Sequence, residues 1–194
     1  MKKYPYFAPP RQVLYFTCGF FSPHPKYVRM KKPPYRIVFI CLGNICRSPL
    51  AEGVFRHLVR EAGLEERFEI ASAGTGGWHV GEPPDRRMIK TAAQHGVDLS
   101  KQRAQQFKAS FIDQYDLILG MDRSNVENML LIAGAGDELD ADIQKVRLFR
   151  DFDPHPGNGE VPDPYYGGQK GFDEVYEMVL RTCKNLLSQL REAV

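Results

Sequence analysis

The stretch that decides the fold of this chain is Tyr35-Arg36-Ile37-Val38-Phe39-Ile40-Cys41-Leu42-Gly43-Asn44-Ile45-Cys46-Arg47-Ser48. Residues 35–41 are mostly apolar, with β-branched and aromatic side chains, which predicts a buried strand. Residues 49–62 have the apolar spacing that is typical of a helix. We therefore predict a strand, a short polar loop and a helix, with Ser48 as the helix cap and Pro49 in the first turn.

The loop over residues 41–48 combines an anion site with a nucleophile. Backbone N–H groups in such a loop point inward above the positive end of a helix dipole, which suits an anion of phosphate size. The planar guanidinium of Arg47 can bind two oxygens of that anion, and the same donors would stabilise a thiolate at Cys41. A strand-end cysteine alone is more often a core residue, but Cys-x5-Arg-Ser between a strand and a helix favours the functional interpretation.

This loop closely resembles the signature of the low-molecular-weight protein tyrosine phosphatases. A second similarity, Asp163-Pro164-Tyr165-Tyr166-Gly167, looks like the general-acid loop of that family. Shorter matches at 72–75, 83–85 and 121–125 follow the family's order, and the resemblance covers about residues 35–191. It implies hydrolysis of phosphotyrosine in proteins, and of small aryl phosphates, through a phosphocysteine intermediate. No cofactor and no metal are expected, because the loop itself supplies the positive field.

Three residues are expected to carry the chemistry. Cys41 would attack phosphorus, and Arg47 would bind the equatorial oxygens. Asp163, as the resemblance implies, would protonate the leaving phenolate, although an Asp-Pro pair by itself only marks a turn. The residues expected to bind substrate are Leu42, Gly43, Asn44, Ile45, Cys46, Ser48, Trp78, Tyr165 and Tyr166.

The loop residues are given separate roles. Gly43 and Asn44 tolerate the unusual dihedral angles that a phosphate cradle needs. Ser48 is also expected to donate to the thiolate, and the resemblance adds Ser72 to that network, although a plain strand-end serine is an equal alternative. Cys46 either fills the loop or captures oxidised Cys41 in a protective disulfide.

Aromatic residues are expected to wall the pocket. The glycines around Trp78 indicate an exposed loop tip, although tryptophan is more often a core residue. Tyr165 and Tyr166 follow the candidate acid and are suited to contact an aromatic phosphoester. Two positions depart from many relatives, which carry His near Gln102 and Arg near Gln105, so the polar support of the cradle is expected to differ here.

Strand and helix patterns alternate along the remaining chain. The expected strands are 68–72, 115–119 and 145–149; the expected helices are 84–94, 107–112, 122–132 and 172–190, with a long loop at 150–170. This alternation predicts an α/β fold: a single domain with a four-stranded parallel sheet, helices on both faces and the phosphate-binding loop after strand 1. Functional loops should then follow the carboxyl ends of the strands.

Composition divides the chain into two parts. Residues 1–34 are rich in proline and are predicted to be a flexible N-terminal extension, with Met30 as a possible alternative start; residues 35–194 are the predicted domain.

The chain carries a formal net charge of +2 and residues 1–29 carry +5, so the remainder carries −3. An acidic domain argues against a nucleic-acid partner. No apolar run has transmembrane length, and the oligomeric state is left open.

The cysteines favour a reducing compartment. The four, Cys18, Cys41, Cys46 and Cys183, have neither zinc spacing nor a dense disulfide pattern, so a cytoplasmic location is expected. An arsenate reductase would need further cysteines, and a non-catalytic phosphotyrosine-binding module would need the loss of nucleophile or acid. A protein-arginine phosphatase is a closer alternative, but those relatives typically carry Thr where Ile45 stands. Tyrosine-phosphorylated proteins are therefore the expected partners.

Overall fold

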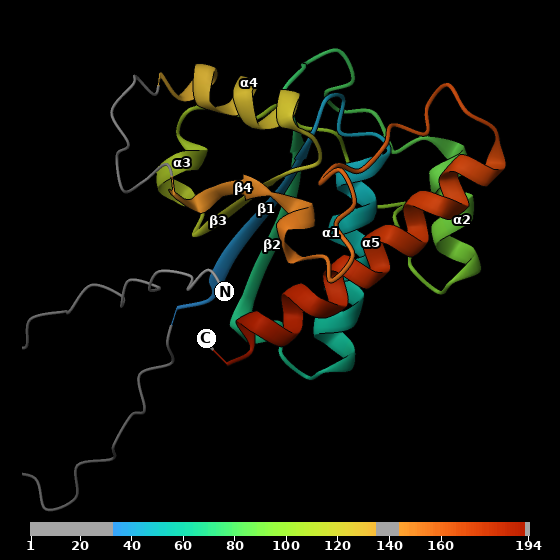
Figure 1. Ribbon diagram of the computed structural model, residues 1–194, viewed down its shortest axis with the longest axis horizontal. Coiled ribbons are helices and arrows are strands. Elements are labelled where there is room, and N and C mark those ends of the chain that lie inside the picture. The colour runs from blue at the N-terminus through green and yellow to red at the C-terminus, as the bar shows by residue number, and fades with distance from the viewer. Residues whose placement is uncertain (1–32, 135–143, 193–194) are drawn as a thin grey trace, which may run out of the picture. The chain divides into compact units, whose positions relative to one another are not determined.

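A computed structural model describes residues 33–134 and 144–192, and strands alternate with helices through it as expected (Figure 1). The elements in chain order are β1 (Tyr35–Cys41), α1 (Arg47–Glu61), the 3₁₀ turn η1 (Glu65–Arg67), β2 (Phe68–Gly74), α2 (Arg86–Gln94), α3 (Phe111–Gln114), β3 (Leu117–Gly120), α4 (Arg123–Ala133), β4 (Val146–Leu148), the 3₁₀ turn η3 (Phe149–Phe152) and α5 (Gln169–Leu190).

The sheet has four parallel strands in the order β2-β1-β3-β4. Ile37 of β1 is in register with Ile70 of β2 on one side and with Leu117 of β3 on the other. The strand that leads into the Cys41 loop is therefore an interior strand with a partner along each edge. The predicted four-stranded parallel sheet is confirmed.

Helices cover both faces of this sheet, which confirms the predicted layers. Figure 1 shows α1, α2 and α5 on one side and α3 and α4 on the other. Side chains of β1 alternate between the two sides, because successive residues of a strand point to opposite faces. Ile37 and Phe39 belong to the larger apolar cluster with α1 and α5, whereas Val38 and Ile40 belong to the smaller one.

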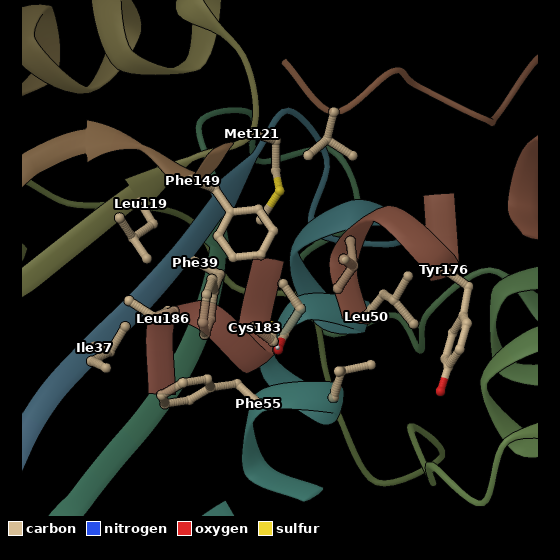
Figure 2. Packing of buried hydrophobic residues seen from close by; sticks show 14 of the residues in the cluster. Ile37, Phe39, Leu50, Phe55, Leu119, Met121, Phe149, Tyr176, Cys183 and Leu186 are labelled. Carbon is tan, nitrogen blue, oxygen red and sulfur yellow. Dashed lines mark hydrogen bonds between the residues drawn. The ribbon is translucent and has the colours of Figure 1, made fainter. Parts of the chain in front are cut away.

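Aromatic rings hold the larger cluster together (Figure 2). The ring of Phe39 meets Phe55 of α1 and Phe149 edge-on, with centroids 5.8 and 5.6 Å away. Cys183 of α5 is fully buried in the same cluster, and burial raises the pKa of its thiol. Cys183 is thus a core residue of the last helix, and this packing fixes α1 and α5 against β1.

Several element boundaries differ from the predictions. The helix expected from residue 84 begins at Arg86, because Asp85 caps it by accepting a hydrogen bond from the Arg87 N–H. The helix predicted over residues 107–112 is wrong at its start: the N–H of Phe107 donates to the Gly74 carbonyl at 2.7 Å, and α3 begins only at Phe111. The last helix begins earlier than expected, at Gln169.

The extension predicted for residues 1–34 lies outside the described residues except for Pro33 and Pro34, so its flexibility stays a prediction. Within residues 33–134 and 144–192, no helix is both long enough and apolar enough to span a membrane.

Asp153 anchors the long loop that follows β4. Its carboxylate accepts hydrogen bonds from Arg150 at 3.1 Å, from Arg181 at 2.8 and 2.9 Å, and from Thr182 at 3.1 Å. Burial alone would raise its pKa, but the bonds from Arg181, from the His155 N–H and from Thr182 together lower the pKa of Asp153 to about 2. The loop leading toward Asp163 is therefore tied to α5 through the buried carboxylate of Asp153, which accepts from Arg181 and Thr182.

Replacing Asp153 with Asn is expected to lower the free energy of unfolding at pH 7 by on the order of 3 kcal/mol, because it leaves a buried arginine without its counter-charge. The folded-state pKa is depressed, so this stabilisation is present above about pH 4 and is lost as pH falls toward about 2. Urea unfolding of wild type and variant at pH 7 and at about pH 2 measures this loss of stability. Asp151→Asn, on the surface of the same loop, is the control; equal losses in the two variants would contradict the assignment.

Candidate active site

A pocket of about 310 Å³ opens beyond the carboxyl end of β1. It is lined by Cys41, Leu42, Gly43, Ile45, Cys46, Arg47, Trp78, His79, Asp163, Tyr165 and Tyr166. All but two of the predicted catalytic and substrate-binding residues therefore line this pocket. The other two, Asn44 and Ser48, are buried within the cradle and bond to Cys41. His79 is an additional wall that the sequence analysis did not include.

The sulfur of Cys41 is surrounded by hydrogen-bond donors. It accepts the backbone N–H of Asn44 at 3.3 Å, and the hydroxyl of Ser48 lies 3.0 Å away. An anionic sulfur only accepts hydrogen bonds, so in the thiolate form Ser48 must be the donor. This arrangement suits a thiolate nucleophile at the base of the pocket.

The cradle depends on an unusual backbone at Asn44, which has φ 55 and is the only non-glycine residue with positive φ in the described chain. Its side-chain oxygen accepts the Gln105 N–H at 2.9 Å, and its amide donates to Ser48 and Ser72, each at 2.9 Å. The unusual dihedral angle expected at Asn44 is observed. Gly43 does not have the positive φ that was expected; an added Cβ there would lie 3.1 Å from the His79 ring, so a larger residue would need this ring to shift.

A buried carboxylate orders this network. Ser72 donates its hydroxyl hydrogen to Glu52, and Arg56 donates to the other carboxylate oxygen of Glu52 at 2.6 Å. Because the Ser72 hydrogen is committed, Ser72 must accept from the Asn44 amide, and Ser48 accepts from the same amide. The hydrogen of Ser48 is then free for the Cys41 sulfur or for the Ala73 carbonyl at 3.2 Å.

Two interpretations change at the start of α1. Ser48 is not the cap: the helix begins at Arg47 after Cys46, with no side-chain cap, and the hydroxyl of Ser48 is used in the cradle instead. Glu52 was missed because an acid on an amphipathic helix is usually solvated. Gln105, one of the two departures, also bonds to the Ser72 carbonyl at 2.8 Å, so the cradle is supported by an amide at this position.

Arg47 is held by three acceptors. One nitrogen donates to Asp122 at 2.6 Å and to the Val161 carbonyl at 3.2 Å, and the other donates to Asp163 at 3.1 Å. Burial acts to lower the pKa of the guanidinium, but the charges of Cys41, Asp163 and Asp122 raise it, so Arg47 remains a cation. Asp122 also accepts the Asn125 N–H at 2.7 Å as the cap of α4.

Asp163 is far from the cradle residues in sequence but lines the same pocket. One oxygen accepts the Tyr165 N–H at 3.1 Å and the other contacts Arg47. Asp122 was not predicted as a site residue, and its bond to Arg47 makes it the residue that orients the guanidinium. The motif at residues 121–125 was the available signal.

The second cysteine of the loop differs sharply from the first. Cys46 is buried, and desolvation above all, with a smaller contribution from the charge of Asp85, raises the pKa of its thiol. It is therefore a neutral thiol at neutral pH. Both cysteines are free in this structure, and capture of oxidised Cys41 by Cys46 stays a prediction.

Aromatic side chains form the rim. Trp78 is 73% exposed, which agrees with the expected loop tip, and its ring lies over Gly76, where an added Cβ would collide with it. Tyr165 and Tyr166 meet edge-on with centroids 5.1 Å apart, and Tyr166 is 95% exposed. A flat aromatic leaving group could contact these rings while its phosphate reaches the cradle.

A thiol, a guanidinium and a carboxyl around one anion-sized cradle, with an aromatic rim, define a cysteine-dependent phosphatase for aryl phosphates. In the described part of the chain, no three His, Cys, Asp or Glu side chains are grouped so that they could hold a metal ion.

Comparison with known proteins agrees with this class. The profile of the family described as "Low molecular weight phosphotyrosine protein phosphatase" matches residues 36–194. The chain is 45% identical to a low molecular weight protein-tyrosine-phosphatase of Streptomyces coelicolor over 162 residues, covering 82% of this chain and 96% of the relative. The chain therefore belongs to the low molecular weight protein tyrosine phosphatase family, whose members hydrolyse phosphotyrosine with a cysteine nucleophile.

Solved structures show the same fold. YfkJ from Bacillus subtilis has a TM-score of 0.77 at 32% identity, over 84% of this chain and 98% of that one. An arginine phosphatase from Drosophila has a TM-score of 0.72 at 29% identity, over 80% and 97%. The shared fold thus accommodates more than one phosphorylated residue.

Arg47→Lys is expected to lower kcat/KM for p-nitrophenyl phosphate by ~10²–10³-fold, because one ammonium group cannot bond to Asp122 and present two parallel donors to phosphate. Steady-state kinetics measures the loss. Arg60→Lys, an exposed position on the same helix, is the matched control and should leave the rate unchanged. A near-normal rate for Arg47→Lys would mean that the guanidinium does not bind the reacting phosphate.

Proposed function

We propose that this chain hydrolyses phosphotyrosine in proteins with Cys41 as nucleophile, Arg47 as phosphate ligand and Asp163 as general acid. The observation that carries the proposal is the meeting of these groups in one pocket, although Arg47 and Asp163 are 116 positions apart in the chain. Asn44 and Ser48 support the thiolate, and the backbone of residues 42–46 supplies donors for the phosphate oxygens.

In the first step, the Cys41 sulfur attacks phosphorus and a P–S bond forms while the bond to the tyrosine oxygen breaks. The electron pair of the broken bond goes to that oxygen, which takes a proton from Asp163. Arg47 binds two equatorial oxygens and stabilises the charge they carry in the transition state. A phosphate oxygen replaces the Asp163 carboxylate on Arg47, which frees the acid to reach the leaving oxygen.

In the second step, water attacks the phosphocysteine and the P–S bond breaks. The sulfur leaves as a thiolate stabilised by Ser48 and the Asn44 N–H, while the Asp163 carboxylate, having given up its proton, accepts one from the water. Inorganic phosphate leaves and the starting state is restored. The same side chains therefore serve both half-reactions, which is consistent with a site that needs no other proton carrier.

The substrate is proposed to be phosphotyrosine rather than phosphoarginine. The rim formed by Trp78, Tyr165 and Tyr166 offers aromatic contacts to a phenyl ring. Ile45 lines the pocket where arginine phosphatases typically carry threonine, so an apolar wall faces the group attached to phosphorus. Tyrosine-phosphorylated proteins of the cytoplasm are the proposed partners, because a thiolate enzyme needs a reducing compartment. Comparing hydrolysis of phosphotyrosine and phosphoarginine tests this choice.

Cys41→Ser is expected to abolish turnover while phosphate still binds, because the hydroxyl stays protonated where a thiolate would form. Initial rates with p-nitrophenyl phosphate and calorimetric titration with inorganic phosphate measure the two properties. In acid-quenched reactions, wild-type protein should carry covalently bound phosphate and the variant none. Turnover close to that of wild type would refute Cys41 as the nucleophile.

Asp163→Asn is expected to slow phenyl phosphate hydrolysis by ~10²–10⁴-fold, the usual contribution of a general acid. The loss should be smaller for p-nitrophenyl phosphate, because nitrophenolate departs with little help from a proton donor. KM should change little, and the alkaline limb of the pH–rate profile should vanish. Asp151→Asn, in the same loop, is the control. If Asp163→Asn keeps its rate on phenyl phosphate, the acid has been misassigned although Cys41 could still be the nucleophile.

A further inference from the structure

Arg87, the second residue of α2, has no role in the mechanism above, yet its contacts join three segments of the site. Two of its nitrogens donate to the two carboxylate oxygens of Asp85 at 3.0 and 2.8 Å. A third donates to the backbone carbonyl of Tyr165 at 3.0 Å, 78 positions away. The guanidinium carbon lies 4.6 Å from the ring centroid of Phe172 in the first turn of α5 and 5.4 Å from that of Tyr165.

The Asp85 end of this bridge is fixed to the phosphate cradle. The N–H of Asp85 donates to the carbonyl of Ile45, a cradle residue, at 2.8 Å. The carboxylate of Asp85 also caps α2, and hydrogen bonds from Arg87 lower the pKa of Asp85, so the pair is ionised at neutral pH. The guanidinium is thereby oriented by a group that cannot move without the cradle.

The Tyr165 end of the bridge reaches the general acid. Both backbone polar groups of Tyr165 are engaged: its carbonyl accepts from Arg87, and its N–H donates to the Asp163 carboxylate at 3.1 Å. A continuous chain of bonds therefore runs from the cradle through Asp85 and Arg87 to Tyr165 and on to Asp163. The carboxyl group is itself 41% exposed, so it has little packing of its own to hold it.

We propose that Arg87 is a positioning residue for proton transfer, which holds Asp163 at a fixed place relative to the phosphate cradle. The inference rests on the proposed function, in which Asp163 is the general acid. The geometry requires arginine: its fork bonds to both oxygens of Asp85 and still has a nitrogen for Tyr165, whereas a lysine ammonium is a single point of charge. Proton transfer is sensitive to such positioning, because a displacement of about 1 Å can cost ~10²-fold in rate.

The test uses two substrates that differ in their need for a proton. Phenyl phosphate has a basic leaving oxygen, whereas 2,4-dinitrophenyl phosphate has a leaving group that departs unprotonated. Arg87→Met is expected to lower kcat/KM, which reports the first step, by ~10-fold or more on phenyl phosphate, with a change in kcat/KM below ~2-fold on the dinitrophenyl ester. Arg87→Lys should show the same pattern and guards against a folding defect in the methionine variant. Arg86→Met, the exposed neighbouring position, is the control with the same change of charge and should match wild type on both esters.

A double variant identifies the route of the effect. If Arg87 acts through Asp163, Arg87→Met combined with Asp163→Asn should hydrolyse phenyl phosphate at the rate of Asp163→Asn alone. If the losses of the two single variants multiply in the double variant, the inference is overturned. Equal losses of the Arg87 variants on the two esters would also overturn it. Either result would mean that Arg87 acts on the cradle or on stability. Unchanged kinetics in both Arg87 variants would also overturn the inference. Failure of the proposed function is seen separately, as a normal phenyl phosphate rate in Asp163→Asn itself, and the Arg87 inference would fall with it.

Discussion

The cradle depends on one residue held in a left-handed backbone conformation. For Asn44 this conformation costs roughly 1 kcal/mol, and three side-chain hydrogen bonds at about 1 kcal/mol each offset it. The partners come from α1, from β2 and from the segment after α2, namely Ser48, Ser72 and Gln105. The shape that turns the Asn44 N–H toward the Cys41 sulfur is thus a property of the whole domain rather than of an eight-residue loop.

Two cysteines five positions apart illustrate how environment decides chemistry. The sulfur of Cys41 meets an N–H and a hydroxyl, and it lies near the buried cation of Arg47. The sulfur of Cys46, at the start of α1, is dominated by desolvation, which keeps it protonated. The loop therefore presents one sulfur that is suited to act as a nucleophile rather than two. Arg47 is in turn balanced by Asp122 and Asp163, so the pocket concentrates charge without leaving any buried charge unpaired.

Local patterns were sufficient to predict the strand, loop and helix around Cys41 and the parallel sheet, whereas the distant acid was indicated by the resemblance to the phosphatase family. They failed where tertiary contacts override local preference. The helix expected over residues 107–112 loses its first turn because Phe107 pairs with Gly74, and Ser48 is drawn into the cradle instead of capping a helix. The contacts of Glu52 and Arg87 join elements far apart in the chain, and no periodicity encodes which surface arginine will meet which carbonyl.

The interior position of β1 has a consequence for the motions of the site. This strand is hydrogen-bonded along both edges and covered by apolar clusters on both faces, so it can open only when the sheet itself comes apart. Cys41, at the end of this strand, is therefore expected to lie next to slowly exchanging backbone. The side chain of Tyr166 lies at the surface and can change its rotamer without disturbing the core. Rigidity and mobility are therefore divided within the site: the strand that ends at Cys41 opens only with the sheet, whereas the exposed Tyr166 ring at the rim can move.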